Sequence, residues 1–386
     1  MDNDKVVDIV TEDPIWGVID DNQIKIKSKI KEFEVAVQKV ISKNTINSRH
    51  VSCEVLYDGK DVGLSGKLES LNYTDNSSGV SDEITLTFCG RDADWLKTDF
   101  IPEKEHDLDV TLWLYNWKKE GDLLKYHCGN FILDDLTYSG SPRQCTIRGV
   151  SVPASGSFQV DPLSKTWKRV TLKQIAKEMM DKYGMTDLYY WGAEPVIETV
   201  EQSAQTDSEF LYDICEKQGM FLKIYKKALV IFDKAVYEPR GITAYYTEKD
   251  FEGNWEWNST LNGTYTGATI SYTGPKPKKR KKGVKQQVIQ VTVGQGPRLL
   301  HINQKADNEG EARRIARAKI NAENEKAVTV NFAAMGDPNV VATCNIEIYG
   351  MGRCDGKYFV DKVTHQVSGS SGYSMNVSGY RIFDRL

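Results

Sequence analysis

The chain has 386 residues, which at about 100–200 residues per domain is enough for two to four domains. Hydrophobic residues make up 40% of the chain and charged residues 27%, a balance that is typical of a folded globular protein and excludes wholesale disorder. The formal net charge of -4 gives no support to a nucleic-acid binder.

The sequence contains no segment with the character of a membrane span or a secretory signal. Its longest apolar runs, such as residues 228–232, are much shorter than the about 20 residues that cross a bilayer. Residues 1–8 carry acids and no apolar core follows them. We therefore expect a protein without a membrane span that is made and folded in a cytoplasm.

Residues 1–45 are expected to form an N-terminal extension. Its apolar residues recur at helical spacing, although Ile24 and Ile26 also alternate with lysines as in a strand. We predict a helix that packs either on its own chain or on a neighbour. The apolar positions of that helix are Ile26, Ile30, Phe33, Val37 and Val40.

Residues 46–158 show the two-residue alternation of β-strands, as in Ile84, Leu86 and Phe88 with threonines between them. The strands follow one another closely and no helical pattern separates them, which predicts a barrel or a sandwich. The predicted strands cover residues 51–57, 84–88, 110–114, 131–136 and 145–152.

Residues 159–240 are predicted to form a small α/β module. One helix begins after Thr171, with Gln174 as its capping partner, and ends at Gly184. A second begins after Thr206 and ends at Gly219. Two short apolar strands, at 221–225 and 228–232, follow the second helix.

Residues 241–386 return to a β pattern and contain one helix. That helix is predicted to begin at Asn308, with Glu311 as capping partner. The predicted strands cover residues 264–272, 287–293, 327–332, 341–349, 357–364 and 374–382.

A basic loop separates two of these strands. It has seven lysine or arginine residues between positions 276 and 285 and no acid. Such a run could contact an acidic partner or passing DNA, but it contains no aromatic residue to stack on bases, so we favour a solvated hairpin tip. The candidate interaction residues are Lys276, Lys278, Lys279, Arg280, Lys281 and Lys282.

Two nine-residue segments of the chain match each other. Residues 129–137 read GNFILDDLT and residues 356–364 read GKYFVDKVT, with the Gly, Asp and Thr in common. In both places a polar turn and a further strand follow, near the end of a β region. The match favours a duplication, so we expect two similar β-barrels in which Asp134 and Asp361 are equivalent.

Residues for catalysis or metal binding are not evident in the sequence. The five histidines form no His-x-x-x-His pair, and no nucleophile elbow or phosphate loop is present. His127 and Cys128 are neighbours on a predicted strand, so they point to opposite faces. The adjacent carboxylates Asp134 and Asp135 are more typical of a solvated turn than of a glycosidase pair. We therefore predict no catalytic residue, no cofactor and no metal site.

The seven cysteines are scattered and include no Cys-x-x-Cys pair. This pattern predicts small buried hydrophobic side chains and no disulfide framework or zinc site. The cysteines are Cys53, Cys89, Cys128, Cys145, Cys215, Cys344 and Cys354.

Three parts of the sequence resemble the phage late control protein D family, which includes baseplate hubs of contractile phage tails and of R-type bacteriocins. Residues 129–152 (GNFILDDLTYSGSPRQCTIRGVSV) resemble the closing hairpin of its first barrel. Residues 170–185 (VTLKQIAKEMMDKYGM) and 205–221 (QTDSEFLYDICEKQGMF) resemble its central module. Residues 311–320 (EARRIARAKI) and 350–382 resemble its second barrel, so the likeness covers about residues 45–386.

The resemblance implies a mainly β fold with α+β character, in which two related tube-like β-barrel domains flank a small α/β module. It implies a structural, non-enzymatic homotrimer, made in a bacterial cytoplasm and assembled into a baseplate. The expected partners are the tail tube protein, the central spike protein and other baseplate proteins, with DNA only as cargo in the lumen. The alternatives are a cell-wall hydrolase of the same baseplate and a secretion-system spike-base protein.

Overall fold

The computed structural model describes residues 7–8, 48–79, 81–90, 106–151, 158, 161–225, 227–273, 288–304, 306 and 308–386. The helix predicted near residues 26–40 lies outside these residues, and so does the basic loop. None of the described helices is long and apolar enough to cross a membrane.

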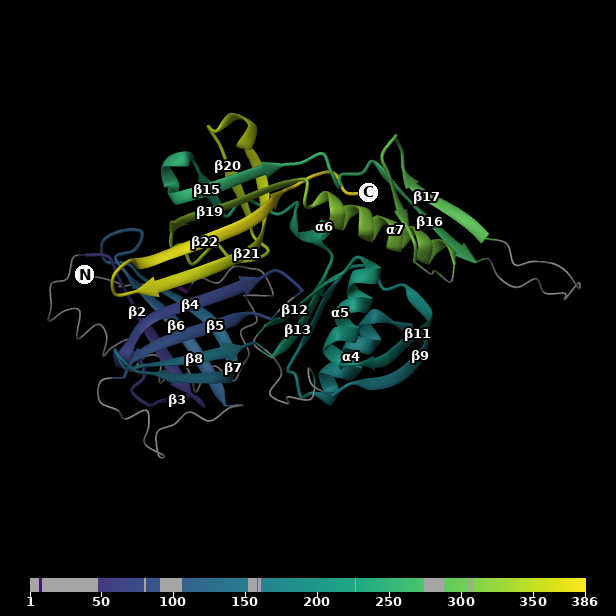
Figure 1. Cartoon of the computed structure of the whole chain (residues 1–386). Coiled ribbons are helices and arrows are strands. Elements are labelled where there is room, and N and C mark those ends of the chain that lie inside the picture. Colours follow the sequence, from purple (N-terminus) through teal and green to yellow (C-terminus); the bar gives the residue numbers. More distant parts are fainter. Residues whose placement is uncertain are drawn as a thin grey trace, which may run out of the picture.

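A 14-stranded sheet forms the body of the molecule and runs in the order β15-β19-β22-β21-β4-β5-β8-β7-β6-β2-β3 (Figure 1). Its N-terminal half bends into a first barrel, and its C-terminal half bends into a second barrel with β20 and β14. The first barrel contains β2 (His50–Tyr57), β3 (Lys60–Asp61), β4 (Leu68–Asn76), β5 (Glu83–Cys89), β6 (Asp107–Tyr115), β7 (Leu123–Ser139) and β8 (Gln144–Val150), and β1 (Val7–Asp8) pairs with β7. The second contains β14 (Ala244–Tyr246), β15 (Phe251–Ser259), β19 (Val328–Met335), β20 (Asn345–Ile348), β21 (Gly356–Ser368) and β22 (Gly372–Arg381).

Alternating side chains build the cores of both barrels. In β5, for example, Ile84, Leu86 and Phe88 are fully buried while the residues between them are half-buried. The first core also takes in Val341 and Tyr373 from the second barrel's part of the chain, so the two barrels share a boundary. The second core is built from residues of β19, β20, β21 and β22.

The central module lies beside the barrels and packs two helices against two small sheets (Figure 1). Thr171 and Thr206 each close a capping box at the start of a helix, with Gln174 and Glu209 as partners, which confirms both predicted helix starts. Gly219 ends the second helix with a φ of 73°, a left-handed conformation that favours glycine. The elements are β9 (Leu163–Thr171), α4 (Leu172–Lys182), β10 (Leu188–Trp191), β11 (Val196–Gln205), α5 (Asp207–Gln218), β12 (Phe221–Tyr225), β13 (Ala228–Phe232) and the short α6 (Lys234–Tyr237).

A further layer lies within the last third of the chain, next to the module rather than in the second barrel. Three strands, β16 (Gly267–Thr273), β17 (Val288–Gly294) and β18 (Leu299–Ile302), are covered by α7 (Glu309–Asn324). The predicted cap Asn308 accepts a hydrogen bond from the backbone of Glu311. Close to the end of α5, Ala318 of α7 would lie 3.2 Å from a Cβ placed on Gly219. Residues 241–386 thus contain two packing units.

Two glycines in equivalent strands should be sensitive to an added methyl group. A Cβ on Gly379 of β22 would lie 2.4 Å from the carbonyl oxygen of Phe359, and one on Gly149 of β8 would lie 2.9 Å from Cβ of Phe131. We expect Gly379→Ala to lower the free energy of unfolding by about 1–3 kcal/mol, as overpacking does. Urea unfolding measures the change. Gly140→Ala is the matched control because its Cβ would meet nothing within 4 Å, and equal stability of the two variants would contradict the close packing.

Candidate functional site

The two barrels carry the same terminal hairpin, made of β7 with β8 and of β21 with β22. Asp134 lies at a bulge in β7, and Asp361 lies at a bulge in β21. The pair just before each bulge has a glycine on the partner strand, Gly149 in β8 and Gly379 in β22. The two aspartates therefore occupy the same position of equivalent hairpins, as the repeat predicts.

The strands on either side of this hairpin also follow the same order in the two barrels. The order β4-β5-β8-β7-β6-β2 in the first barrel matches β15-β19-β22-β21-β20-β14 in the second. The outermost pair differs, since β2 pairs antiparallel with β6 whereas β14 pairs parallel with β20. The first barrel's β4 is thus the counterpart of the second barrel's β15.

A joint between the barrels forms where β21 changes its neighbour. Before the bulge, β21 pairs with β20 of its own barrel. After the bulge, residues 362–368 pair antiparallel with β4 of the first barrel, from Lys362 opposite Asn76 to Ser368 opposite Ser70. One continuous sheet therefore crosses from one barrel to the other.

Polar contacts fix the register of this joint on its outer face. The backbone N–H of Ser77 donates to the carbonyl of Asp361 at 2.8 Å, next to the bulge. Three residues further along each strand, the hydroxyl oxygens of Thr74 and Thr364 lie 3.3 Å apart.

His365 marks the inner face of the joint and is fully buried. Its ring nitrogens lie 2.9 Å from the hydroxyl of Tyr373 and 3.2 Å from that of Tyr126, and its ring stacks on Tyr73 of β4 with 5.8 Å between centroids. Burial lowers the pKa of His365 to about 3, so the imidazole is neutral at physiological pH. The neutral ring needs one donor and one acceptor, which two hydroxyls can provide.

The central module reaches into one strand of the joint through Lys223 of β12. Its ammonium, buried with Asp75 and Asp82, lies 2.5 Å from Asp75 Oδ1 and 2.9 Å from Asp82 Oδ2. Burial raises the pKa of Asp82 to about 7 despite the nearby lysine. Asp75 also accepts the backbone N–H of Ala342 at 2.8 Å, so this cluster connects both barrels and the module.

A second lysine of the module, Lys234, reaches the other strand of the joint. It is 3% exposed, and its ammonium lies 2.9 Å from Glu325 Oε2 and 3.2 Å from Asp361 Oδ1. It also lies over the rings of Phe221, Phe359 and Tyr380. Next to it, Arg385 bridges Glu238 and Glu325, which fixes the end of the chain.

Two strand edges equivalent to those of the joint have no partner strand in the described part of the molecule. Beyond its bulge, β7 pairs only with β8, and β15 pairs only with β19. Leu136 and Tyr138 of β7 are half-buried, whereas their counterparts Val363 and His365 are fully buried at the joint. The open edge of β7 therefore carries apolar side chains that a pairing like the joint would bury.

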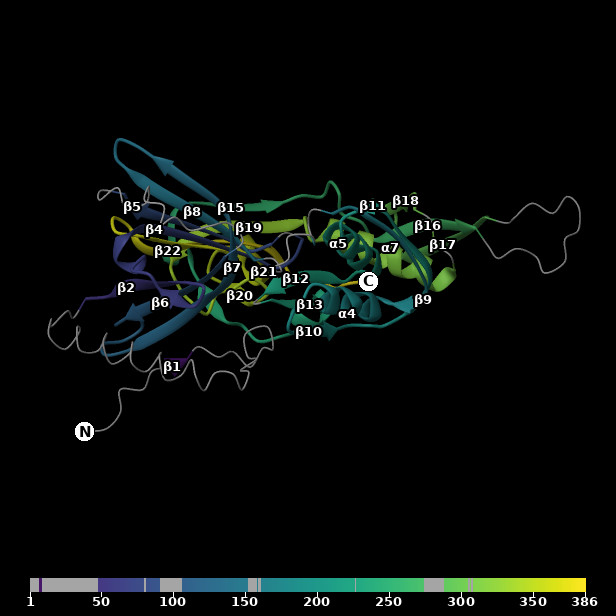
Figure 2. The same ribbon diagram turned by 90° about the horizontal axis from the view of Figure 1, so that it is seen from below.

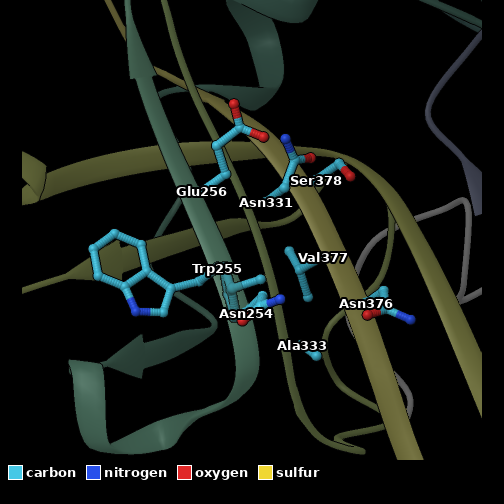
Figure 3. Close-up of a pocket in the computed structure, with 9 residues that line it drawn as sticks. Asn254, Trp255, Glu256, Asn331, Ala333, Asn376, Val377 and Ser378 are labelled. Atoms are coloured by element: carbon cyan, nitrogen blue, oxygen red, sulfur yellow. The ribbon is translucent and has the colours of Figure 1, made fainter.

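A shallow pocket lies beside the open strand β15 (Figure 3). Its lining crosses β15, β19 and β22 and mixes amide, hydroxyl and apolar side chains, with Trp255 and Glu256 from the open strand. A single carboxylate without a base beside it offers no acid–base pair for catalysis. The remaining lining residues are Asn254, Asn331, Phe332, Ala333, Asn376, Val377 and Ser378.

The structure does not bring the candidate nucleophile, acid and base residues of the sequence together. His127 contacts Asp109 at 2.8 Å, whereas Cys128 is buried and its desolvation raises the pKa of the thiol well above its usual range. Asp134 and Asp135 are exposed. Within the described ranges, no group of three or more His, Cys, Asp or Glu side chains is placed to hold a metal ion.

The basic loop lies outside the described residues, so the favoured solvated hairpin tip and the alternative of an interaction site both stay predictions. Its candidate interaction residues are Lys276, Lys278, Lys279, Arg280, Lys281 and Lys282. The joint and the buried lysine clusters were not predicted from the sequence. The available signal was Lys223 inside an otherwise apolar strand, because a buried lysine needs charged partners.

A scan against family models matches residues 152–371 to the phage tail baseplate hub (GPD) family. The chain belongs to this baseplate hub family. No curated protein sequence gives a significant match to the hub.

Solved structures that share the fold include two tail proteins and a secretion-system component. The 43 kDa tail protein of prophage MuSo2 from Shewanella oneidensis is 15% identical, with a TM-score of 0.61 over 86% of the hub and 98% of that protein. A tail protein from Neisseria meningitidis MC58 is 11% identical, with a TM-score of 0.63 over 86% and 96%. The Escherichia coli protein c3393, a component of the type VI secretion system, is 10% identical, with a TM-score of 0.52 over 86% and 78%. These likenesses, together with the mainly β architecture, agree with the fold class expected from the sequence.

Acid should weaken the hub through His365. Its pKa in the folded state, about 3, lies below the 6.5 of an ordinary histidine, so the unfolded chain binds the extra proton as the pH falls. Stability from this group is complete above pH 6.5 and decreases toward pH 3, by about 2 kcal/mol between pH 7 and pH 5 at about 1.4 kcal/mol per pH unit. Urea unfolding of His365→Gln should show a correspondingly smaller loss over that interval. Identical pH profiles for the two proteins would contradict a neutral buried histidine.

Removing the ammonium of Lys223 should destabilise the hub strongly. Lys223→Met leaves Asp75 and Asp82 buried without their cation, which costs about 3–5 kcal/mol for a broken buried pair. Thermal or urea unfolding measures the loss. Lys173→Met is the matched control, because its pair with Glu194 is exposed and should contribute less than about 1 kcal/mol. If both variants lose the same stability, the buried cluster has no special role.

Proposed function

We propose that the hub forms a homotrimeric ring with pseudo-sixfold symmetry that joins the hexameric tail tube to the trimeric central spike of a contractile phage tail or R-type bacteriocin. The observation that carries the proposal is the internal joint, in which β21 of the second barrel pairs with β4 of the first. Different strands of two related barrels meet there, so the contact is head to tail. Head-to-tail contacts generate closed rings when their rotation closes.

The duplication reconciles two symmetries. Three chains with two barrels each place six similar barrels around one axis. Six similar surfaces can contact a hexameric tube on one side of the ring, while the three copies of the module and its neighbouring layer repeat with threefold symmetry. A spike with threefold symmetry fits that arrangement.

The proposed partners are a tube protein, a spike protein and other baseplate proteins, and DNA would pass only as cargo through the lumen of a phage. We propose that the chain is structural and not an enzyme, since its buried ionic groups hold parts of the fold together. It would be made in the bacterial cytoplasm and then assembled into the particle. We also propose the division into an extension (1–45), a first barrel (46–158), the module (159–240) and a second barrel region (241–386).

A spike-base subunit of a secretion system is the second candidate. It is supported by the fold shared with the type VI secretion component c3393. That component is itself described as structurally similar to the T4 bacteriophage tail proteins gp27 and gp5, so the same kind of ring would serve in a secretion system.

Co-expression with the tube and spike proteins encoded nearby in the same genome tests the ring. Native mass measurement should find three hub chains for each spike trimer, and electron microscopy should show a ring with six similar lobes. One hub chain per spike trimer, or six, would contradict the proposal. Placement of the chain in the sheath or the tail fibres would also contradict it.

A further inference from the structure

The two open strand edges have the same positions in their barrels as the two strands of the internal joint. The part of β7 beyond its bulge corresponds to the second half of β21, and β15 corresponds to β4. We infer that residues 135–139 of one copy pair antiparallel with residues 256–260 of the next copy, which repeats the internal joint between chains. This inference rests on the proposed three-chain ring and names the surfaces that close it.

The backbone of β15 presents its hydrogen-bonding groups to the open side. Thr260 donates its backbone N–H to the carbonyl of Ala327, at 2.8 Å, on the side of β19. Since residues of an antiparallel ladder point their amides alternately to the two neighbours, Trp257 and Ser259 point theirs away from β19. These groups can accept a second strand.

The backbone of β7 is directed in the same way as that of β21. Leu133 donates to the carbonyl of His106 just before the bulge, and Val360 of β21 donates to that of Cys344 at the equivalent place. After its bulge, β21 directs its backbone N–H and C=O groups to β4, as the hydrogen bond from Ser77 N–H to the carbonyl of Asp361 shows. The same bulge in β7 directs the backbone N–H and C=O groups of Leu136 and Tyr138 to the open edge.

The internal joint also specifies the register between chains. Tyr138 corresponds to His365 by the repeat, and Trp257 corresponds to Tyr73 through the strand pairings of the two barrels. Because His365 lies opposite Tyr73, Tyr138 lies opposite Trp257 in the joint between chains. The strand pairings connect Gly149 to Ile84 and Tyr73 in the first barrel, and Gly379 to Val330 and Trp257 in the second.

The side chains in this register suit both faces of a sheet. On the inner face, Tyr138 and Trp257 form an aromatic pair at the positions that His365 and Tyr73 occupy in the internal joint. On the outer face Thr137 lies opposite Asn258, two polar residues that are exposed in one copy. An open edge with half-exposed apolar residues is a template for strand pairing, and the next copy is the one partner that already contains the matching edge.

Engineered cysteines test the register. In the double variant Thr137→Cys/Asn258→Cys, the two cysteines would face each other across the joint between chains, within the 4.4–6.8 Å between Cα atoms that a disulfide requires. Mild oxidation of the hub assembled with tube and spike should give covalent trimers on a denaturing gel. Either single variant should give only monomers. As the positive control, Thr74→Cys/Thr364→Cys should close a disulfide within one chain, since these hydroxyls lie 3.3 Å apart.

A displaced pair provides the matched negative control. Thr137→Cys/Glu252→Cys uses exposed residues of the same two strands, but Glu252 lies opposite Ala333 of β19 whereas Asn258 lies opposite Thr329. The pair is therefore four positions out of register, about 14 Å at about 3.4 Å per residue, and should not cross-link. A three-chain particle that gives no covalent trimer overturns this interface and leaves the proposed ring intact. A hub that stays monomeric with its partners, or assembles with another copy number, overturns both.

A proline in β15 provides an independent test. Ser259→Pro removes an N–H that points away from β19, so the melting temperature of the isolated chain should equal that of Ser259→Ala. Ser259→Pro should fail to form the ring with tube and spike, whereas Ser259→Ala should form it. Normal ring assembly by the proline variant overturns the inference.

Discussion

The pairing of β21 with β4 is the contact on which the other parts of the molecule depend. It turns two separate barrels into one continuous sheet, and it buries His365 between them. Both strands of the joint carry an aspartate, Asp75 in β4 and Asp361 in β21. The central module contributes one buried lysine to each, Lys223 and Lys234, so the module binds the joint from both strands. Figure 2 shows this arrangement from below, with β12 and β13 between the barrels and the helices α4 and α5.

These buried charges are better explained by register than by raw stability. Desolvation offsets much of the attraction in a buried ion pair, and apolar replacements of both partners are often as stable. A shift of β4 by one residue, however, would turn Asp75 to the opposite face of the sheet and leave Lys223 without that partner. The clusters therefore exclude neighbouring registers of the joint. A ring built from repeated joints would need the same register in every chain.

The sequence predicted most local elements because local signals encode them. Capping residues such as Thr206 and Asn308 marked the helix starts, and strict alternation marked strands such as β5. The strands β4, β9, β11 and β15 were missed because polar or glycine-rich stretches such as FEGNWEWNS in β15 lack alternation. The hairpin repeat was visible, since nine consecutive residues carry it. The joint was not, because its strands are about 290 residues apart and each half looks like an ordinary strand.

Because of that separation, one strand of the joint waits unpaired while the rest of the chain is synthesised. When β4 leaves the ribosome, its partner has yet to be synthesised, since Thr364 follows Thr74 by 290 residues. At about 5–20 residues per second, the edge of β4 stays unpaired for about 15–60 s. An unpaired strand edge is a template for pairing with another chain, so a finished chain nearby can occupy the edge of β4 during this interval. Domain swapping is the expected failure of this arrangement, and faster synthesis of residues 77–355 would favour pairing within one chain because it shortens the interval.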